Sequence, residues 1–258
     1  MCFRIAELIP EEEVKTDLLD YVVEAHGGLK LWNELETVSA RLIQGGVLWA
    51  VKGQQGVLDD VFVTASLREE RLSHYPFGAA GRRSVFTPER VAIESDDGTV
   101  VEALDQPQAS FAGHTLETPW TTPQLAYFVG TAMWTYLTQP LTFTLPGFET
   151  AELEPWQENG EQQRRLRVVW PSHLATLNTV LTVYVGDDGL IRREDYDVEI
   201  LGGSAGAHYM SGYTMSGYTR VAGIMLPTGH RIFSRTPEGQ ALTEPLLVSI
   251  DLSEITFA

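Results

Sequence analysis

The chain has 258 residues, and its hydrophobic share of 43% and aromatic share of 10% are those of a globular protein with a sizeable core. It carries 35 acidic against 18 basic residues, a net charge of -17, and such a field repels phosphate backbones and anionic bilayers. Nucleic-acid and membrane-surface roles are therefore disfavoured. The one cysteine, Cys2, excludes an internal disulfide framework.

The first ten residues lack the apolar core of a signal peptide, and no apolar stretch reaches the ~18 residues that a membrane span needs. We therefore expect a cytoplasmic protein without a membrane span. No linker divides the chain, so residues 1–258 are predicted to form a single domain.

The first part of the chain predicts a helix over residues 10–32 and strands over residues 37–103. Pro10 suits a first helical turn, and Gly27-Gly28 interrupts the helical pattern. The period then changes to two. The predicted strands include Val57–Val63, Arg82–Phe86, and Arg90–Glu94 paired with Thr99–Glu102 across Asp96-Asp97-Gly98, a good hairpin turn.

A second helix is predicted over residues 122–138. Thr122 can cap it, Pro123 suits its first turn, and Pro140 ends it. Apolar side chains cover most of its circumference, and a helix of this kind must be buried on several sides. We expect it to lie like a plug in the concavity of a sheet.

Strands fill the rest of the chain, over residues 148–257. Within Ile191–Ile200, apolar and acidic residues alternate. Tyr196, Val198 and Ile200 would face one side of the sheet, and Asp195, Asp197 and Glu199 the other, as expected for a sheet with one face in water. Arg220–Leu226 and Arg231–Arg235 also read as strands. In Leu246–Phe257 the apolar parity switches between Leu252 and Ile255, which predicts a bulge.

About ten strands and two or three helices indicate a mainly β fold. We predict a curved antiparallel sheet that forms a half-barrel or open barrel, with an N-terminal helix and a buried central helix.

The sequence contains no convincing match to a known catalytic motif. Gly202–Gly206 matches G-x-S-x-G, but no helix follows it, so a loop is expected there. The six histidines are scattered without metal-ligand spacing, and no phosphate-binding loop is present. We predict no metal site and no cofactor.

Three segments concentrate groups that can transfer protons or orient a carbonyl. The candidate catalytic residues are His114, His208, Tyr209, Tyr213 and His230, and the candidate ligand-binding residues are Trp49, Glu117, Tyr127, Trp134, Arg231 and Arg235. The alternative is structural: the histidines would cap turns or satisfy buried carbonyls, the arginines would be solvated strand charges, and the aromatic rings would be core.

Several strings resemble a widespread group of uncharacterised bacterial proteins along nearly the whole chain: Ala25-His-Gly-Gly-Leu-Lys-Leu-Trp-Asn33, Phe111–Trp120, His208-Tyr-Met-Ser211, and Pro227-Thr with Arg231. The resemblance brings no catalytic residues with it. The chain departs from the group at Tyr213, where the pattern has a histidine, and at Gly229-His230, which interrupt a basic run.

The helix–Gly-Gly–Trp opening and the late string Gly223–Thr228 are similar to the half-barrel of the LolA-type lipoprotein carriers. This resemblance implies a concave apolar sheet that holds acyl chains. The leading hypothesis is therefore a protein that binds a hydrophobic small molecule, lipid-, polyketide- or terpenoid-like, in the concavity of its sheet. The alternatives are a cofactor-independent cyclase, isomerase or hydratase that uses the same cavity, and a structural or protein-binding module.

Overall fold

The computed structural model describes residues 17–210 and 217–258, and strands make up much more of the structure than helices. The helices are α1 (Leu18–Ala25), α2 (Gly28–Trp32), α3 (Leu48–Val51) and α4 (Thr122–Thr138), with 3-10 turns at η1 (Pro107–Phe111), η2 (Leu141–Thr144) and η3 (Glu199–Leu201).

The strands before α4 are β1 (Thr37–Gly45), β2 (Val61–Ser66), β3 (Leu72–Tyr75), β4 (Arg82–Phe86), β5 (Arg90–Ser95) and β6 (Val100–Asp105). Those after it are β7 (Glu149–Glu158), β8 (Glu161–Val169), β9 (Val180–Val185), β10 (Ile191–Val198), β11 (Ser204–Met210), β12 (Tyr218–Val221), β13 (Ile224–Pro227), β14 (Gly229–Arg235), β15 (Ala241–Leu242) and β16 (Val248–Phe257).

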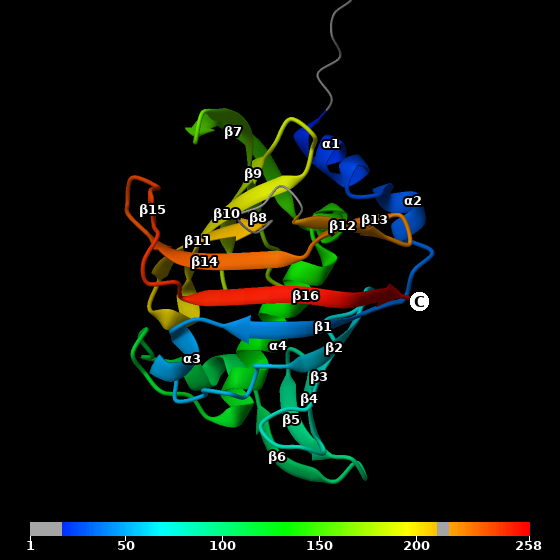
Figure 1. Cartoon of the computed structure of the whole chain (residues 1–258), viewed down its shortest axis with the longest axis vertical. Coiled ribbons are helices and arrows are strands. Elements are labelled where there is room, and N and C mark those ends of the chain that lie inside the picture. The colour runs from blue at the N-terminus through cyan, green and yellow to red at the C-terminus, as the bar shows by residue number, and fades with distance from the viewer. Residues whose placement is uncertain (1–16, 211–216) are drawn as a thin grey trace, which may run out of the picture.

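One large antiparallel sheet of 14 strands dominates the described residues, in the order β6-β5-β4-β3-β2-β1-β16-β14-β11-β10-β9-β8-β7, with β15 beside β14. The sheet is curved but not closed, since β6 and β7 remain at its two edges. Strand β16 pairs with both β1 and β14, so the end of the chain joins the two halves (Figure 1). The predicted open, curved sheet is confirmed.

Local turn chemistry explains the hairpins. Between β5 and β6, the carboxylate of Asp97 accepts hydrogen bonds from the Thr99 backbone N–H and the Ser95 hydroxyl, at 2.9 and 2.7 Å. The predicted pairing across this turn is confirmed. The predicted bulge in β16 is also confirmed, because the register of β16 on β1 shifts between Ser253 and Thr256 and Glu254 has a φ of 52°.

Helix α4 lies against the concave face of the N-terminal half of the sheet, strands β2 to β6 (Figure 1). A capping box starts it: the Thr121 hydroxyl accepts from the Gln124 backbone N–H, and the Gln124 side chain accepts from the Thr121 backbone N–H. The cap is thus Thr121, one residue before the predicted Thr122. At Gly130 a Cβ would stand 2.5 Å from the ring of Phe86, so glycine permits this close approach. The helix of residues 122–138 and its burial are confirmed.

Three local predictions need correction. The strand expected over residues 57–63 begins at Val61, because residues 57–60 turn. The strand expected at Arg220–Leu226 is a two-stranded hairpin, β12–β13, which turns at Ala222 and Gly223, both with positive φ. Ser204 to Gly206 of the G-x-S-x-G string belong to β11 rather than to a loop.

The N-terminal helix is described from Leu18 and consists of two pieces. Gly27, with a φ of 119°, separates α1 from α2, as the Gly27-Gly28 pair predicts. Residues 10–16 of the predicted helix lie outside the described residues.

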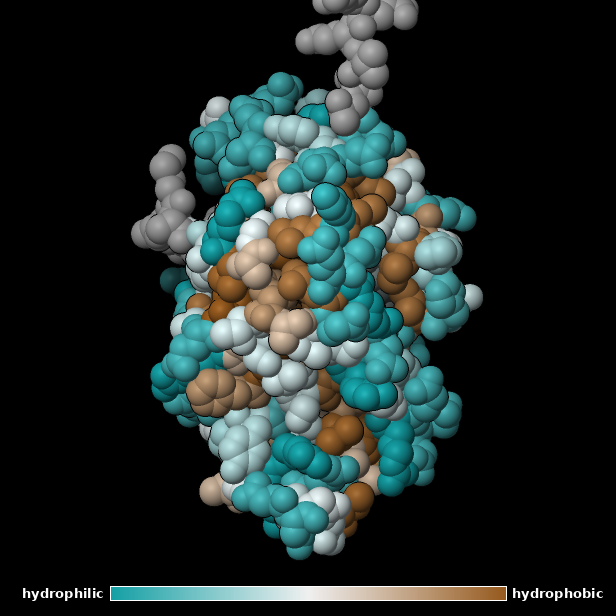
Figure 2. Space-filling view, turned by 90° about the vertical axis from the view of Figure 1, so that its right-hand side faces the viewer, coloured by the Kyte–Doolittle hydropathy of each residue, from teal (hydrophilic) through white to brown (hydrophobic). Residues whose placement is uncertain are grey.

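Hydrophilic side chains interrupt the apolar patches on the face seen in Figure 2, which is the right-hand side of Figure 1. None of the helices in the described part of the chain has the length and hydrophobicity needed to cross a membrane.

Candidate functional site

A cavity of about 80 Å³, partly open to solvent, lies between α4 and the C-terminal half of the sheet. Its volume leaves room for several water-sized groups. Most of its wall is apolar, with Trp49, Phe128, Met133, Leu181, Ile232 and Val248 among the lining residues. Because α4 packs against β2 to β6, the facing strands β1, β16, β14, β11, β10 and β9 are left free to form the opposite wall.

Strand β10 presents two different environments on its two faces. Glu194, Tyr196 and Val198 line the cavity. Arg193 and Asp195 point to the other face, where they form a separate charged cluster. This is the alternation of a strand, in which successive side chains point to opposite faces of the sheet.

Three buried titratable side chains form a line that starts at the cavity wall, on the adjacent strands β10, β11 and β14. Glu194 Oε2 lies 3.6 Å from His208 Nδ1, and His208 Nε2 lies 2.8 Å from His230 Nδ1. All three side chains are at most 2% exposed. Glu194 Oε1, His208 Nδ1 and His230 Nε2 have no hydrogen-bond partner among the described residues, so His208–His230 is the one hydrogen bond within the line.

Burial is the main influence on the protonation of this line. It raises the pKa of Glu194 to about 8, against a smaller lowering by Gln139, and the charge of Asp195 adds to the rise. It lowers the pKa of His208 to about 3 and that of His230 well below its usual range. At neutral pH all three groups are therefore uncharged.

Two tyrosines connect this line to the cavity. Tyr136 of α4 lies 5.1 Å from the His230 ring at an interplanar angle of 18°, and 4.5 Å from the His208 ring. Its hydroxyl is 3.3 Å from that of Tyr196. The Tyr196 ring lies over Gly206, where a Cβ would stand 3.1 Å from it. Both tyrosines line the cavity together with Glu194, so two phenol groups belong to the same wall as this carboxyl.

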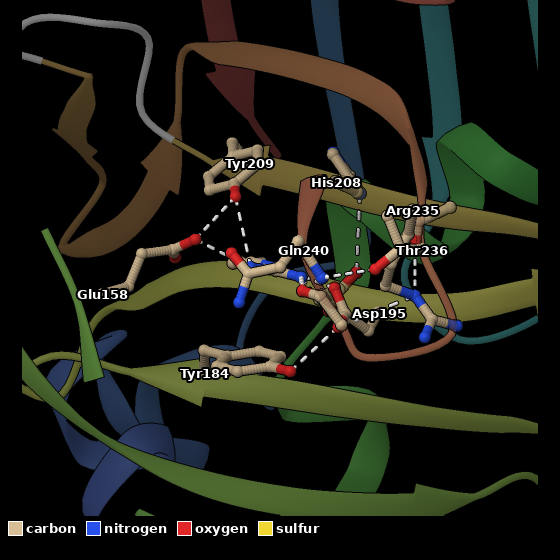
Figure 3. Close-up of polar contacts among 12 residues, drawn as sticks. Glu158, Tyr184, Asp195, His208, Tyr209, Arg235, Thr236 and Gln240 are labelled. Atoms are coloured by element: carbon tan, nitrogen blue, oxygen red, sulfur yellow. Dashed lines mark hydrogen bonds and ion pairs between the residues drawn. The ribbon is translucent and has the colours of Figure 1, made fainter. Parts of the chain in front are cut away.

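The opposite face of the same strands holds a charged cluster around Arg193, which is 0% exposed. Figure 3 shows four residues of this cluster, Glu158, Tyr184, Asp195 and Tyr209. The Arg193 guanidinium donates two hydrogen bonds to Asp195, at 2.7 and 2.9 Å, and one to Glu158, at 2.8 Å. The rings of Tyr184 and Tyr209 flank it at 4.9 and 5.3 Å. Every charge of the cluster has a partner, so we assign it a structural role.

A buried lysine holds the segment that precedes α4. Lys52 Nζ donates to the carbonyls of Thr115, Leu116 and Thr118, at 3.0, 2.6 and 3.2 Å, and lies 4.6 Å from the centroid of Trp120. Burial lowers the pKa of Lys52 to about 8, and the charge of Glu117 offsets part of this effect. Because Leu116 lines the cavity, Lys52 fixes part of its rim.

We expect Lys52→Met to loosen this rim and to destabilise the protein by about 1–2 kcal/mol, because three carbonyls lose a charged donor. Limited proteolysis should then cleave residues 111–121 faster, and urea unfolding gives the stability. Lys30→Met, at an exposed lysine, is the matched control and should change neither result. Equal protection of the segment in both variants would contradict the role of Lys52.

The structure brings two of the five candidate catalytic residues together, His208 and His230. His114 lies on the segment before α4, half-buried against the Phe111 ring, and no contact joins it to the other two. Tyr209 points to the opposite face, where its hydroxyl donates to Glu158. Tyr213 lies outside the described residues.

Of the six candidate ligand-binding residues, Trp49 lines the cavity. The others lie elsewhere: Tyr127 packs against Phe86 and Phe111, Trp134 donates to the Ser66 carbonyl, Glu117 is exposed, Arg231 pairs with Asp251, and Arg235 pairs with Asp195 and Asp197. Tyr127 and Trp134 are buried, and the arginines are ion-paired rather than fully solvated, with side chains 23% exposed for Arg231 and 16% for Arg235.

The sequence patterns do not single out Glu194, Tyr136 and Gln44, which line the cavity, or Lys52, which holds its rim. A signal for Glu194 existed, since it has the parity of Tyr196 and therefore places a carboxyl on the apolar face of its strand. In the described ranges 17–210 and 217–258, no group of three or more histidine, cysteine, aspartate or glutamate side chains could hold a metal ion.

Comparison with known proteins gives matches in structure alone. No protein-family model and no curated protein matches the chain. A DUF1329 family protein from Desulfovibrio piger is 10% identical, with a TM-score of 0.52 over 93% of this chain and 91% of that one.

Two further solved structures are similar. A protein from Vibrio parahaemolyticus assigned as an outer membrane lipoprotein-sorting protein domain is 9% identical, with a TM-score of 0.50 over 93% of this chain and 90% of that one. A LolA superfamily protein from Nitrosomonas europaea is 9% identical, with a TM-score of 0.48 over 92% of each chain. At these identities the likeness concerns the fold, and it confirms the predicted resemblance to the half-barrel of the lipoprotein carriers.

Proposed function

We propose that this protein binds a hydrophobic small molecule in the cavity between α4 and the C-terminal half of the sheet. The observation that carries the proposal is the apolar wall of that cavity, which is partly open to solvent. The fold supports it, because a structure of the same fold is assigned as a lipoprotein-sorting domain. A lipid-, polyketide- or terpenoid-like compound has the apolar surface that such a wall accommodates.

The first test is native mass spectrometry of the freshly purified protein, followed by extraction under denaturing conditions. A co-purifying lipid, polyketide or terpenoid would support the proposal and identify the ligand class. The second test is the uptake of Nile red, an uncharged hydrophobic dye, followed by its fluorescence.

A cavity-filling pair of variants makes the second test specific. Ala132 of α4 lines the cavity, whereas Ala103 on the edge strand β6 is exposed. Ala132→Leu should lower Nile red affinity at least fivefold, because the added side chain occupies the cavity, and Ala103→Leu adds the same atoms outside it. An equal affinity of the two variants would show that the dye binds elsewhere and would contradict the proposal.

A second candidate function is acid–base catalysis in the same cavity, and the line of Glu194, His208 and His230 favours it. Glu194 is the member of this line that reaches the cavity, and a carboxyl that keeps its proton at neutral pH can act as a general acid. His208 and His230 would position it from behind. A cofactor-independent cyclase, isomerase or hydratase would use such a group.

Glu194→Gln separates the two functions without knowledge of the substrate. If Glu194 is a catalytic acid, the variant expressed in the same cells should retain a compound that differs chemically from the one extracted with the parent protein. If the protein only binds, both proteins should yield the same compound, and the enzyme hypothesis would fail.

A further inference from the structure

The wall of the cavity contains one ionisable acid and no counter-charge. Among the described lining residues, Glu194 is the one carboxyl, and lysine, arginine and histidine are absent. The nearby cation Lys52 is already committed to three backbone carbonyls. A ligand with a negatively charged head group therefore finds no positive partner in this wall.

Glu194 belongs to the cavity wall, and one of its oxygens has no hydrogen-bond partner among the described residues. This oxygen is Oε1, and the residue is 1% exposed. Its other oxygen faces His208. A buried polar atom without a partner costs free energy, so Oε1 is an expected contact for a ligand atom.

The groups that face Glu194 from the neighbouring elements are mostly uncharged. They are His208 on β11, Gln139 after α4, Tyr136 on α4, Tyr196 on β10 and Tyr218 on β12, with the charge of Asp195 on the opposite face of β10. Burial raises the pKa of Glu194 to about 8, so the carboxyl holds its proton at neutral pH. A protonated carboxyl both donates and accepts a hydrogen bond.

A second unpartnered group lies at the far side of the cavity. Gln44, on β1, is 5% exposed and lines the cavity, and its Nε2 has no partner among the described residues. Strands β1 and β10 are four positions apart in the sheet, about 19 Å along its curved surface at about 4.8 Å per strand. The two polar groups are thus four strands apart, and the wall between them is mostly apolar, with Ser204 and Ser234 as its polar side chains on β11 and β14.

We propose that the ligand is an uncharged amphiphile whose hydroxyl or carbonyl oxygen hydrogen-bonds to Glu194, and that the cavity rejects compounds with carboxylate or phosphate heads. This inference rests on the proposed binding function and names the ligand class. Transfer of an anion into this wall would remove its water without supplying a cation, and the net charge of -17 opposes its approach.

The test compares three probes that share a twelve-carbon chain: 1-dodecanol, dodecanoate and dodecylammonium. Each displaces bound Nile red at about pH 6.5, where dodecanoate is ionised and Glu194, with its pKa of about 8, is not. We expect dodecanol to bind at least tenfold more tightly than dodecanoate. Native mass spectrometry of each mixture checks the binding independently of the dye.

Two variants test the role of Glu194 itself. Glu194→Gln keeps an uncharged donor and acceptor and should hold dodecanol within about threefold of the parent. Glu194→Leu removes the polar contact and should weaken dodecanol about fivefold, which corresponds to the loss of about one hydrogen bond. Circular dichroism and thermal unfolding verify that both variants fold, and a variant that does not fold leaves the comparison of the three probes as the deciding measurement.

The outcomes separate this inference from the function on which it rests. Dodecanoate binding as tightly as dodecanol would overturn the inference and leave hydrophobic binding intact. Tighter binding of dodecylammonium, lost in Glu194→Gln, would mean that Glu194 is an ionic partner and would also overturn it. If neither Nile red nor any of the three probes binds, the proposed function itself fails.

Discussion

Replacement of Arg193 by leucine is expected to lower the free energy of unfolding by about 3 kcal/mol, measured by urea denaturation. The guanidinium is 0% exposed and donates to the carboxylates of Asp195 and Glu158 and to the Gly239 carbonyl. Its loss leaves Asp195, which is 8% exposed, as a buried charge. Asp195 keeps its contacts with Tyr184 and Arg235 in the variant. The loss of stability should therefore be near the lower end of the ~3–5 kcal/mol that is typical when one partner of a buried ion pair is removed.

The matched control is Arg231→Leu. Arg231 pairs with Asp251 on the same outer face, but the Asp251 side chain is 55% exposed, so this loss should cost less than about 1 kcal/mol. The double variant Arg193→Leu/Asp195→Asn should recover part of the stability, because the unpaired charge is gone. Equal losses for Arg193→Leu and Arg231→Leu would contradict the structural role of the cluster.

The second large effect is the pH dependence that Glu194 gives to stability. Burial raises its pKa to about 8, from about 4.5 in the unfolded chain. Below pH ~4.5 both states hold the proton, and between pH ~4.5 and 8 the unfolded state releases it first, so stability falls as pH rises. The integrated contribution is about 5 kcal/mol. Glu70, whose pKa burial raises to about 7, acts in the same direction.

Buried histidines oppose this trend in acid. Burial lowers the pKa of His26 to about 4 and those of His74 and His208 to about 3, so their contribution to stability is lost as pH falls from about 6.5. We therefore expect the stability of the parent protein to be greatest near pH 6.5.

Glu194→Gln removes the contribution of the Glu194 carboxyl to the pH dependence of stability. Relative to the parent, the variant should gain stability by up to about 1.4 kcal/mol per pH unit between pH ~5 and 8. Urea denaturation across that range measures the gain. Glu238→Gln, at an exposed carboxyl, controls for the loss of one negative charge. A difference between Glu194→Gln and the parent that does not change with pH would mean that Glu194 is ionised in the folded protein.

The sequence predicts those elements that depend on neighbouring residues. The apolar circumference and the proline boundaries of residues 122–138 identify α4, and the parity switch in β16 identifies its bulge. Asp96-Asp97-Gly98 identifies a hairpin because the turn chemistry is local. The order of strands is not local. The place of β16 between β1 and β14 depends on pairing between distant segments, which no single pattern in the sequence encodes.

The candidate site is only partly predictable for the same reason. His208 and His230 meet because β11 and β14 are neighbours, a fact of strand order. Tyr209 is next to His208 in sequence and points to the other face, so proximity along the chain is misleading in a strand. Lys52 has no motif, and its burial depends on the path of the segment at residues 115–118.

The alternation along β10 has a consequence for folding fidelity. A slip of one residue in the pairing of β10 with β9 or β11 would turn Arg193 and Asp195 into the apolar cavity and turn Tyr196 away from it. Because both charges would then lose their partners, the slipped pairing is strongly penalised. The inward positions of β10 can thus mutate toward new ligands during evolution while the outward positions keep the strand in register.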